Sequence, residues 1–305
     1  MTKTDSMKAR IHKAYRAFIV KEEAPLAHQN VLDYYSYVVS NIILGNDRST
    51  PVIEVRCGDV ELSFDENTVI SATGNGVLTV NGERMDFWRS IPIKSGSMVM
   101  LSTSSVAYLS VLGGFKLQGK KGIKLINLGA IDIAESKRDF EAILMEVPGR
   151  FLSSNYIPKT GNPEEIKIVL LGKSEESIDG KEFILYRNGN GHSVVLKSLN
   201  DNIKIAVLEN GDVRVIRGED GEYSVMAEIL PCDFDKLARL TNGSIVRLKA
   251  IGYEDAKIEI FKYLSEINRI EKMIMLSAEA SRRGAVPLRV RFNGNTYNVW
   301  VEEIE

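Results

Sequence analysis

The chain has 305 residues, 44% hydrophobic and 26% charged, which is enough to bury a sizeable core in one large domain or two ordinary ones. Its 39 Lys and Arg against 41 Asp and Glu give a net charge of −2. This balance argues against a nucleic-acid partner, because binding to a polyanion depends on clustered cations. No secretory leader is evident near the start, and the longest apolar runs are about half a membrane span. We therefore expect a cytoplasmic protein with no membrane partner.

Cysteines and histidines are few and scattered. The cysteines are Cys57 and Cys232, and the histidines are His12, His28 and His192. A zinc site needs three or four such ligands, usually with one close pair. We expect no metal site and two free thiols in a reducing compartment.

The first half begins with a polar segment, 2–13, which is expected to be frayed or weakly helical. A helix is predicted over 33–44, because Asp33 is a good N-cap, apolar residues recur at helical spacing, and Gly45 suits the left-handed position after a helix. From Pro51 onward, polar and apolar residues alternate in short runs separated by Asn-Gly and similar turn signals. This pattern is typical of a β-barrel or sandwich rather than of a doubly wound sheet.

The second half repeats this style after a break. A short helix is expected at 139–145, and the Pro- and Gly-rich stretch 148–163 is the predicted domain boundary. Strand-length runs resume over 166–229, and a short helix follows that starts at Asp233 or Asp235.

The chain ends with a long amphipathic helix and a hairpin. Apolar residues recur near the helical period from Tyr253 to Arg282, and Asn293-Gly294 lies between two alternating runs, which is a strong hairpin signal. We predict a mainly β protein with a few helices. The expected domains are 1–160, which contains the helix 33–44, and 161–305, which contains the helix 253–282 and the hairpin.

Two motifs of cofactor-binding proteins are present only in part. Gly114 to Lys121 is similar to a phosphate-binding P-loop, but Lys121 stands where Ser or Thr must hold magnesium, and 122–126 has the pattern of a strand instead of a helix. We interpret this stretch as a basic loop. Lys272 precedes Met as in biotin carriers, but it lies inside a predicted helix, so no biotin attachment site is evident.

Candidate site residues remain open on pattern alone. Asn188 to Ser193 is a glycine-rich turn around His192 that suits either an anion site or a plain hairpin, and the plain turn is the commoner use of such residues. Asp33, Glu54 and His28 can act in acid–base catalysis only if folding brings them together. Otherwise Asp33 is a helix cap and Glu54 a strand carboxylate. No catalytic residue is assigned.

One stretch carries a family resemblance. Residues 32–55 contain Leu-Asp at the start of a helix, Leu-Gly-Asn at its end, and Val-Ile-Glu in the following strand. This order resembles the family of the 5-oxoprolinase C subunit, also called allophanate hydrolase subunit 2 and including kinase-inhibitor-antagonist-like proteins. Matches continue in the same order through Thr73-Gly74 and Tyr108 to Gly114, and again from 228 to 256. The resemblance covers about residues 30–260.

The resemblance implies two cyclophilin-like β-barrel lobes in a protein that works with the B subunit of the same enzyme. Together they would hydrolyse 5-oxoproline, or a related small amide or lactam, with ATP as the cofactor. It also implies a binding cleft in which Asp33, Gly74 and Gly113-Gly114 converge. The candidate cleft residues are Asp33, Asn46, Glu54, Gly74, Gly113, Gly114 and His192.

The chain departs from the family at polar, glycine-rich segments. Residues 120–124 replace Gly-Ser-x-Ser-Thr, and 191–195 replace a Ser-x-Arg-Met-Gly element. Caps, turns and core positions are kept, which supports the fold more than the chemistry. The alternatives are a diverged component of a hydrolase, a non-catalytic binding or regulatory protein on the same scaffold, and a small-molecule carrier. If the protein is an enzyme, we expect a polar cleft at the candidate cleft residues. If it is a scaffold protein, we expect this cleft to be filled and an apolar patch to lie elsewhere on the surface.

Overall fold

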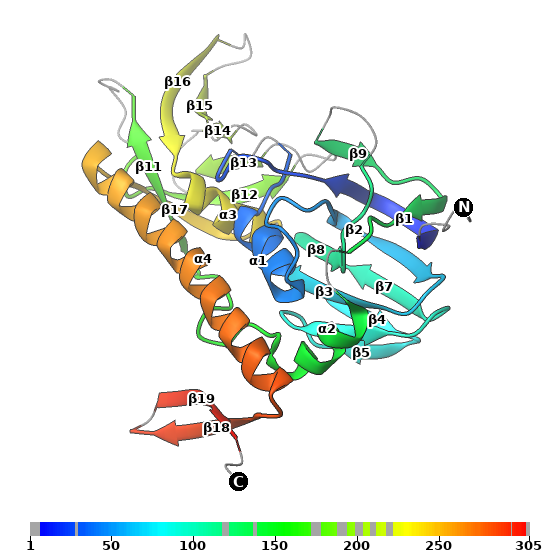
Figure 1. The fold of residues 1–305 in the computed structure, drawn as a ribbon. Helices are drawn as coiled ribbons and strands as arrows, with labels where there is room; N and C mark the ends of the chain where they lie inside the picture. Colours follow the sequence, from blue (N-terminus) through cyan, green and yellow to red (C-terminus); the bar gives the residue numbers. More distant parts are fainter. Residues whose placement is uncertain are drawn as a thin grey trace.

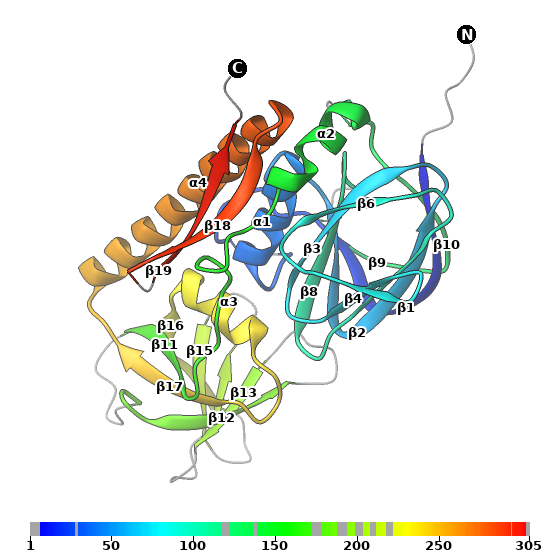
Figure 2. The same ribbon diagram turned by 90° about the horizontal axis from the view of Figure 1, so that it is seen from below.

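A computed structural model describes residues 7–27, 30–117, 122–136, 139–171, 178–187, 194–198, 204–207, 212–217, 222–293 and 295–302. These residues form a mainly β fold with four α-helices (Figure 1). Two curved sheets lie side by side, and the long helix α4 (Tyr253–Arg282) runs diagonally past both (Figures 1 and 2). The predicted fold class of two barrel lobes is confirmed, while the cyclophilin-like classification stays a prediction.

The first lobe is one ten-stranded sheet that curls around its own core. Its central order is β5-β4-β7-β2-β8-β3-β6, and β1 pairs with β2, β9 and β10. Buried apolar residues of β2, β7 and β8 fill the interior. The strands are β1 (Lys8–Val20), β2 (Val52–Phe64), β3 (Thr68–Gly74), β4 (Val77–Val80), β5 (Glu83–Met85), β6 (Ser90–Ile93), β7 (Met98–Ser102), β8 (Val106–Val111), β9 (Ile123–Leu125) and β10 (Gly129–Asp132).

The first strand corrects a sequence expectation. Residues 8–13, expected to be frayed or weakly helical, belong to β1, which pairs antiparallel with β2 along its length. Ala9, Ile11, Ala17 and Ile19 are buried, in keeping with an alternating strand. The period of two was obscured because small alanines fill half of these positions and two bulges interrupt the register.

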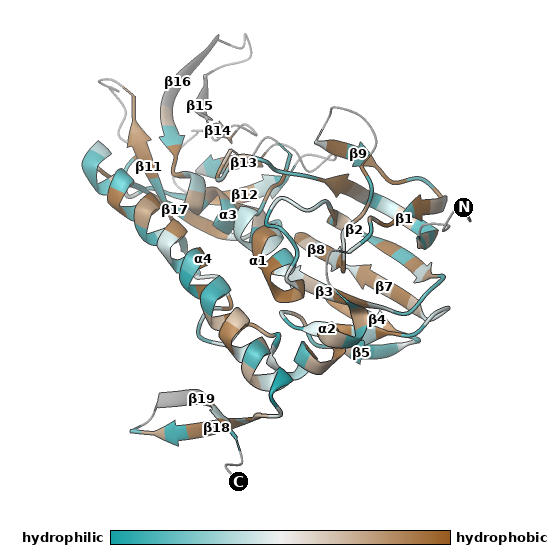
Figure 3. Cartoon of the chain, viewed as in Figure 1, coloured by the Kyte–Doolittle hydropathy of each residue, from teal (hydrophilic) through white to brown (hydrophobic). Residues whose placement is uncertain are grey.

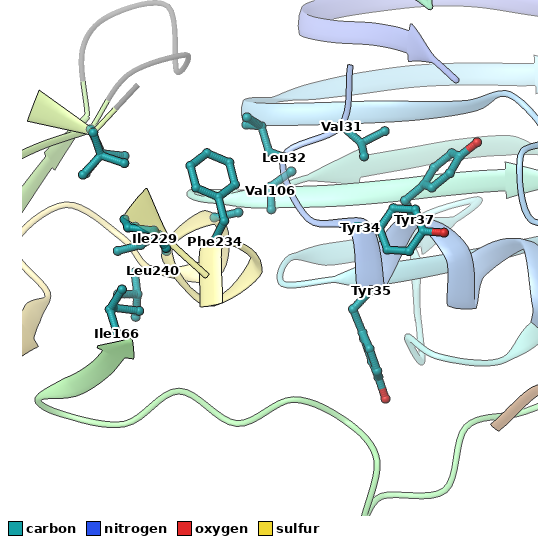
Figure 4. Packing of buried hydrophobic residues seen from close by; sticks show 14 of the residues in the cluster. Val31, Leu32, Tyr34, Tyr35, Tyr37, Val106, Ile166, Ile229, Phe234 and Leu240 are labelled. Carbon is teal, nitrogen blue, oxygen red and sulfur yellow. The ribbon is translucent and has the colours of Figure 1, made fainter. Parts of the chain in front are cut away.

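Helix α1 (Tyr34–Leu44) occupies the space between the lobes. It begins after Asp33 and ends at Gly45, whose φ of 69° is left-handed, so the predicted helix and both of its end signals are confirmed. All of its residues are buried, as expected for a helix that has neighbours on every side. In Figure 4 its tyrosines lie in the same cluster as Ile166 and Phe234 of the second lobe, so one core joins the two lobes.

The second lobe is a closed barrel in the order β11-β16-β15-β14-β13-β12-β17, sealed by parallel pairing of β11 with β17. Its first and last strands are therefore neighbours. The strands are β11 (Glu164–Leu170), β12 (Glu182–Arg187), β13 (Val194–Ser198), β14 (Lys204–Val207), β15 (Asp212–Arg217), β16 (Glu222–Ile229) and β17 (Ile245–Ala250).

Two short helices, one before the second lobe and one between β16 and β17, lie close to the predicted positions. Helix α2 (Phe140–Glu146) confirms the helix expected at 139–145 and is followed by a 3₁₀ turn, Val147–Gly149. Helix α3 (Pro231–Arg239) starts earlier than Asp233. Proline at the first helical position explains the earlier start, since its fixed φ suits that position.

Helix α4 comes after the second lobe in the chain, but it packs against helices of the first half. It contacts α1, α2 and the 3₁₀ turn, and the Ser281 hydroxyl donates to the Met145 carbonyl at 3.1 Å. Figure 3 shows hydrophilic and hydrophobic residues alternating along it, as expected for an amphipathic helix. The predicted hairpin follows as β18 (Val286–Phe292) and β19 (Asn295–Val301). None of the helices in the described ranges is both long enough and apolar enough to cross a membrane.

Candidate functional site

The start of α1 is the point at which the lobes are joined by charge. The buried Asp33 carboxylate caps α1 by accepting from the Ser36 amide at 3.1 Å and the Ser36 hydroxyl at 2.5 Å. It also accepts from Nε of Arg239 at 2.8 Å, which comes from α3 in the second lobe. Asp33 is therefore both a helix cap and one half of an interlobe ion pair.

A second carboxylate occupies the same helix end. Asp235 of α3 accepts from the backbone amides of Tyr34 at 2.7 Å and Tyr35 at 3.0 Å, and from the Tyr263 hydroxyl. A helix N-terminus favours negative charge because its first amides lack intrahelical acceptors. At α1 that charge is supplied by the protein itself, so this helix end is filled.

Arg239 contacts these two carboxylates on its buried side and lines two cavities on its other side. Its Nε and Nη2 both donate to Asp33, and Nη2 lies 3.9 Å from Asp235. Within the described residues Nη1 has no hydrogen-bond partner. Burial works to lower the pKa of this guanidinium, but the two carboxylates outweigh it and raise the pKa above the ordinary value, so Arg239 stays cationic.

Glu54 belongs to a second buried hydrogen-bond network, which reaches Asp33 through the Tyr108 hydroxyl. Its carboxylate accepts from the Leu32 amide at 3.0 Å, from the Tyr108 hydroxyl at 2.5 Å and from Arg56. The Tyr108 oxygen in turn accepts from the Asp33 amide at 2.8 Å. Burial, and then the Glu54 charge, raise the pKa of Tyr108, which stays protonated and donates to Glu54. The folding chain thus brings Asp33 and Glu54 together, as a buried structural network.

Two cavities meet at Arg239. One, of about 510 Å³, lies among α3, α4 and residues 155–159, and the other, of about 550 Å³, lies against the β3–β4 turn and residues 84–88. Their shared walls are residues 157–159 and Arg239. Both volumes lie in the usual range for small-molecule sites. We define these two cavities together as the interlobe groove.

Charged side chains line the first cavity, mostly in pairs. Lys167 bonds to Glu259, and Lys262 bonds to the same carboxylate at 3.0 Å. These hydrogen bonds lower the pKa of Glu259 to about 2, so it is ionised at neutral pH. Lys236 lies 3.1 Å from Asp233. Within the described residues, Lys159 is a cation of this wall that has no ion-pair partner.

Cys232 also lines the first cavity, but its thiol is a poor nucleophile. Burial, and then the neighbouring Asp233 carboxylate, raise its pKa to about 12. We expect alkylating reagents at pH 8 to modify the partly exposed Cys57 and to spare Cys232 until the protein unfolds. Peptide mass analysis in buffer and in guanidinium chloride checks this result.

The raised pKa of Cys232 also determines how protein stability and thiol labelling depend on pH. Because its pKa is higher in the folded than in the unfolded chain, folding favours the protonated thiol, and this contribution to stability is lost as pH rises from about 8.5 towards 12. Labelling of Cys232 should therefore stay slow up to pH 10. Fast labelling of Cys232 in the native protein at pH 8 would contradict the buried, protonated thiol.

The predicted cleft residues do not all converge. Gly74 lines the second cavity beside Arg239, and so lies near Asp33. Asn46 accepts from the Gly113 amide at 3.0 Å, beyond the far end of the 11-residue α1, which is about 16 Å long. A Cβ on Gly114 would lie 2.1 Å from the Thr50 side chain, so this glycine turn is closely packed. His192 and His28 lie outside the described residues.

The sequence did not indicate the two site residues that come from the second lobe, Asp235 and Arg239. Asp235 and Arg239 are four residues apart on α3, a spacing that indicates neighbours on one helix face. Arg239 meets Asp33 across 206 positions of sequence, for which the chain offers no local signal. In the part of the chain that the structure describes, no group of three or more His, Cys, Asp or Glu side chains could hold a metal ion.

The sequence and the structure of this chain are both similar to those of carboxyltransferase-domain, 5-oxoprolinase and urea-processing proteins. The sequence model of the carboxyltransferase domain, subdomains A and B, matches residues 30–122. Urea amidolyase of Saccharomyces cerevisiae is 36% identical over 87 residues, which is 27% of this chain and 5% of that protein. The C subunit of 5-oxoprolinase from Haemophilus influenzae is 23% identical over 295 residues, covering 80% of this chain and 90% of the relative.

Solved structures share the fold. TTHA0988 superposes with a TM-score of 0.63 at 16% identity, covering 81% of this chain and 57% of that one. Kluyveromyces lactis urea carboxylase gives 0.65 at 16% identity, covering 88% and 30%. The chain therefore spans just over half of one structural relative and a small part of the urea-processing proteins, but most of the 5-oxoprolinase C subunit.

Proposed function

We propose that this chain is a diverged relative of the 5-oxoprolinase C subunit and one component of an ATP-dependent hydrolase that opens a small amide or lactam. In this proposal it acts in the cytoplasm with a partner that resembles the B subunit of 5-oxoprolinase, and the interlobe groove holds the substrate. The observation that supports it best is the meeting at Arg239 of two cavities that are both lined by charged side chains. That cation is held in place by the buried carboxylate of Asp33.

The groove suits binding and orientation more than bond cleavage. A fixed guanidinium at its centre can bind a charged substituent or stabilise negative charge that develops on a carbonyl oxygen. Asp33 and Glu54 are fully buried and already bonded, so they act as positioning residues. The raised pKa of Cys232 argues against a thiolate nucleophile in the groove. Activation by ATP and attack by water then fall to the assembly, in which the partner supplies the remaining groups.

A second candidate is a non-catalytic binding or regulatory protein, and two observations favour it. The N-terminus of α1 is filled by Asp33 and Asp235. One face of the β18–β19 hairpin is apolar and open, with residues that are 37–64% exposed. Exposed apolar patches of this kind are typical of interaction surfaces. These residues are Val286, Leu288, Val290, Phe292, Val299 and Val301.

The deciding experiment is ATP hydrolysis by the complex that the tagged full-length chain recovers from its native lysate. We expect 5-oxoproline to stimulate ADP release and to be opened to glutamate, with one ATP consumed per ring. The control is a parallel purification from cells that carry the tag alone. A partner that is recovered without turnover of 5-oxoproline or another small amide would overturn the hydrolase proposal and support the second candidate.

A further inference from the structure

We propose that the junction of the two cavities is an oxyanion site, in which Nη1 of Arg239 and the ammonium of Lys159 bind a carboxylate or phosphate group. The inference rests on the proposed function and deepens it, because it assigns the class of ligand that the interlobe groove selects. The two cations are the charged side chains that line both cavities. Their shared position places two cationic donors at the junction.

Arg239 supplies a donor with a fixed direction. Two of its three nitrogens are held by Asp33, and its ring contact places the guanidinium carbon 5.7 Å from the centre of the Tyr35 ring. Its side chain is 11% exposed, and Nη1 is without a partner among the described residues. A guanidinium fixed on two sides loses little freedom on binding, which favours tight and directional contact with an oxyanion.

Lys159 supplies the second charge from a segment that is anchored to the site. The Tyr35 hydroxyl donates to the Tyr156 carbonyl at 2.6 Å, which holds the segment before Lys159 against α1. The lysine itself is exposed and has no ion pair in the described ranges. In contrast, Lys167, Lys236 and Lys262 of the first cavity each bond to a carboxylate.

The balance of charge favours an anionic ligand over a neutral one. Asp33 and Asp235 compensate Arg239 from the buried side. In the second cavity Arg84 adds another exposed cation, while the one carboxylate there, Asp86, lies 3.6 Å from Arg89, which is outside that wall. Among the described residues, Lys159 and Arg84 are two cations of the groove without a carboxylate partner, against one such carboxylate, Glu266 of the first cavity. An oxyanion at the junction would therefore meet unpaired positive charge, and charge-assisted hydrogen bonds are the strong ones.

The test is calorimetric titration of the isolated full-length chain at constant ionic strength with three probes. These are 5-oxoproline, which has a carboxylate; 2-pyrrolidinone, the same ring without it; and inorganic phosphate. We expect at least one of the two anions to bind and 2-pyrrolidinone not to bind. A carboxylate source is indicated if only 5-oxoproline binds, and a phosphate source if only phosphate binds.

Variants tie the binding to the site. Lys159→Ala should weaken anion binding about tenfold or more, the cost of one charge-assisted hydrogen bond, and Lys159→Arg should restore most of it. Lys94→Ala is the matched control, since Lys94 is an exposed lysine of a distant turn. Absence of anion binding, equal binding of 2-pyrrolidinone, or an unchanged affinity in Lys159→Ala would each overturn the inference.

This test separates the two proposals. Binding by the isolated chain requires no turnover, so anion binding that depends on Lys159 together with an inactive complex would sink the hydrolase proposal alone. An active complex in which Lys159→Ala leaves the KM for 5-oxoproline unchanged would sink the oxyanion site alone.

Discussion

Replacement of Asp33 by alanine should lower the free energy of unfolding by about 3–5 kcal/mol, which is the typical cost of removing one partner of a buried ion pair. The change leaves Arg239 without the carboxylate that binds two of its nitrogens and removes the cap of α1. Urea denaturation of the full-length chain at pH 7 measures the loss.

Asp139→Ala is the matched control for the loss at Asp33. Asp139 caps α2 by accepting from the Ala142 amide at 3.1 Å, but it is exposed, so its removal should cost only about 1 kcal/mol. Asp33→Asn keeps an acceptor for Ser36 and removes the charge, and so isolates the ion pair. Equal losses at Asp33 and Asp139 would show that the interlobe pair contributes nothing beyond a cap.

Replacement of Gly149 by alanine should cost about 3 kcal/mol, at the upper end of the range for overpacking. A Cβ at this position would lie 2.2 Å from the Ser277 carbonyl oxygen and 2.8 Å from the Ala278 amide nitrogen of α4. These are backbone atoms that cannot rotate away, so the helix must shift from the 3₁₀ turn. The midpoint of urea denaturation reports the effect.

Gly252→Ala provides the comparison at the other end of α4. Gly252 precedes the helix with φ of −71°, a value open to any residue, and a Cβ there would meet its nearest neighbour at 3.6 Å. We expect a change within about 1 kcal/mol. If Gly149→Ala were as mild as Gly252→Ala, the close contact between α4 and the first lobe would be contradicted.

Elements with strong local signals could be predicted from the sequence. Helix α1 has an Asp cap and a terminal glycine, α4 has a long apolar period, and an Asn-Gly signal in the sequence separates the two runs of the hairpin. Each of these elements lies where its signal placed it. Strand β1 was missed because bulges and alanines weaken its alternation. Local periodicity is therefore sufficient to predict an element when that element's own residues determine its secondary structure.

The candidate site was less predictable, because it depends on pairing between distant segments. Asp33 was identified, but its ion pair with Arg239 exists only once both lobes have folded. Asn46 and Gly113 were grouped with Asp33 by family order, yet they form a turn beyond the opposite end of α1. Sequence order therefore gave the right helix, and only the three-dimensional structure separates what lies at its two ends.

The pairing of β11 with β17 bears on the order of events during synthesis. The ribosome releases β11 long before β17, so the second barrel cannot close until residues near 250 have emerged. The α1 amides likewise wait for Asp235 before their bonds form. Until the second half has been synthesised, α1 has its Asp33 cap but lacks the bonds from Asp235 and the second-lobe side chains that pack on it, so its apolar residues stay exposed. The core and the hydrogen bonds that join the two lobes therefore form only after both have been synthesised.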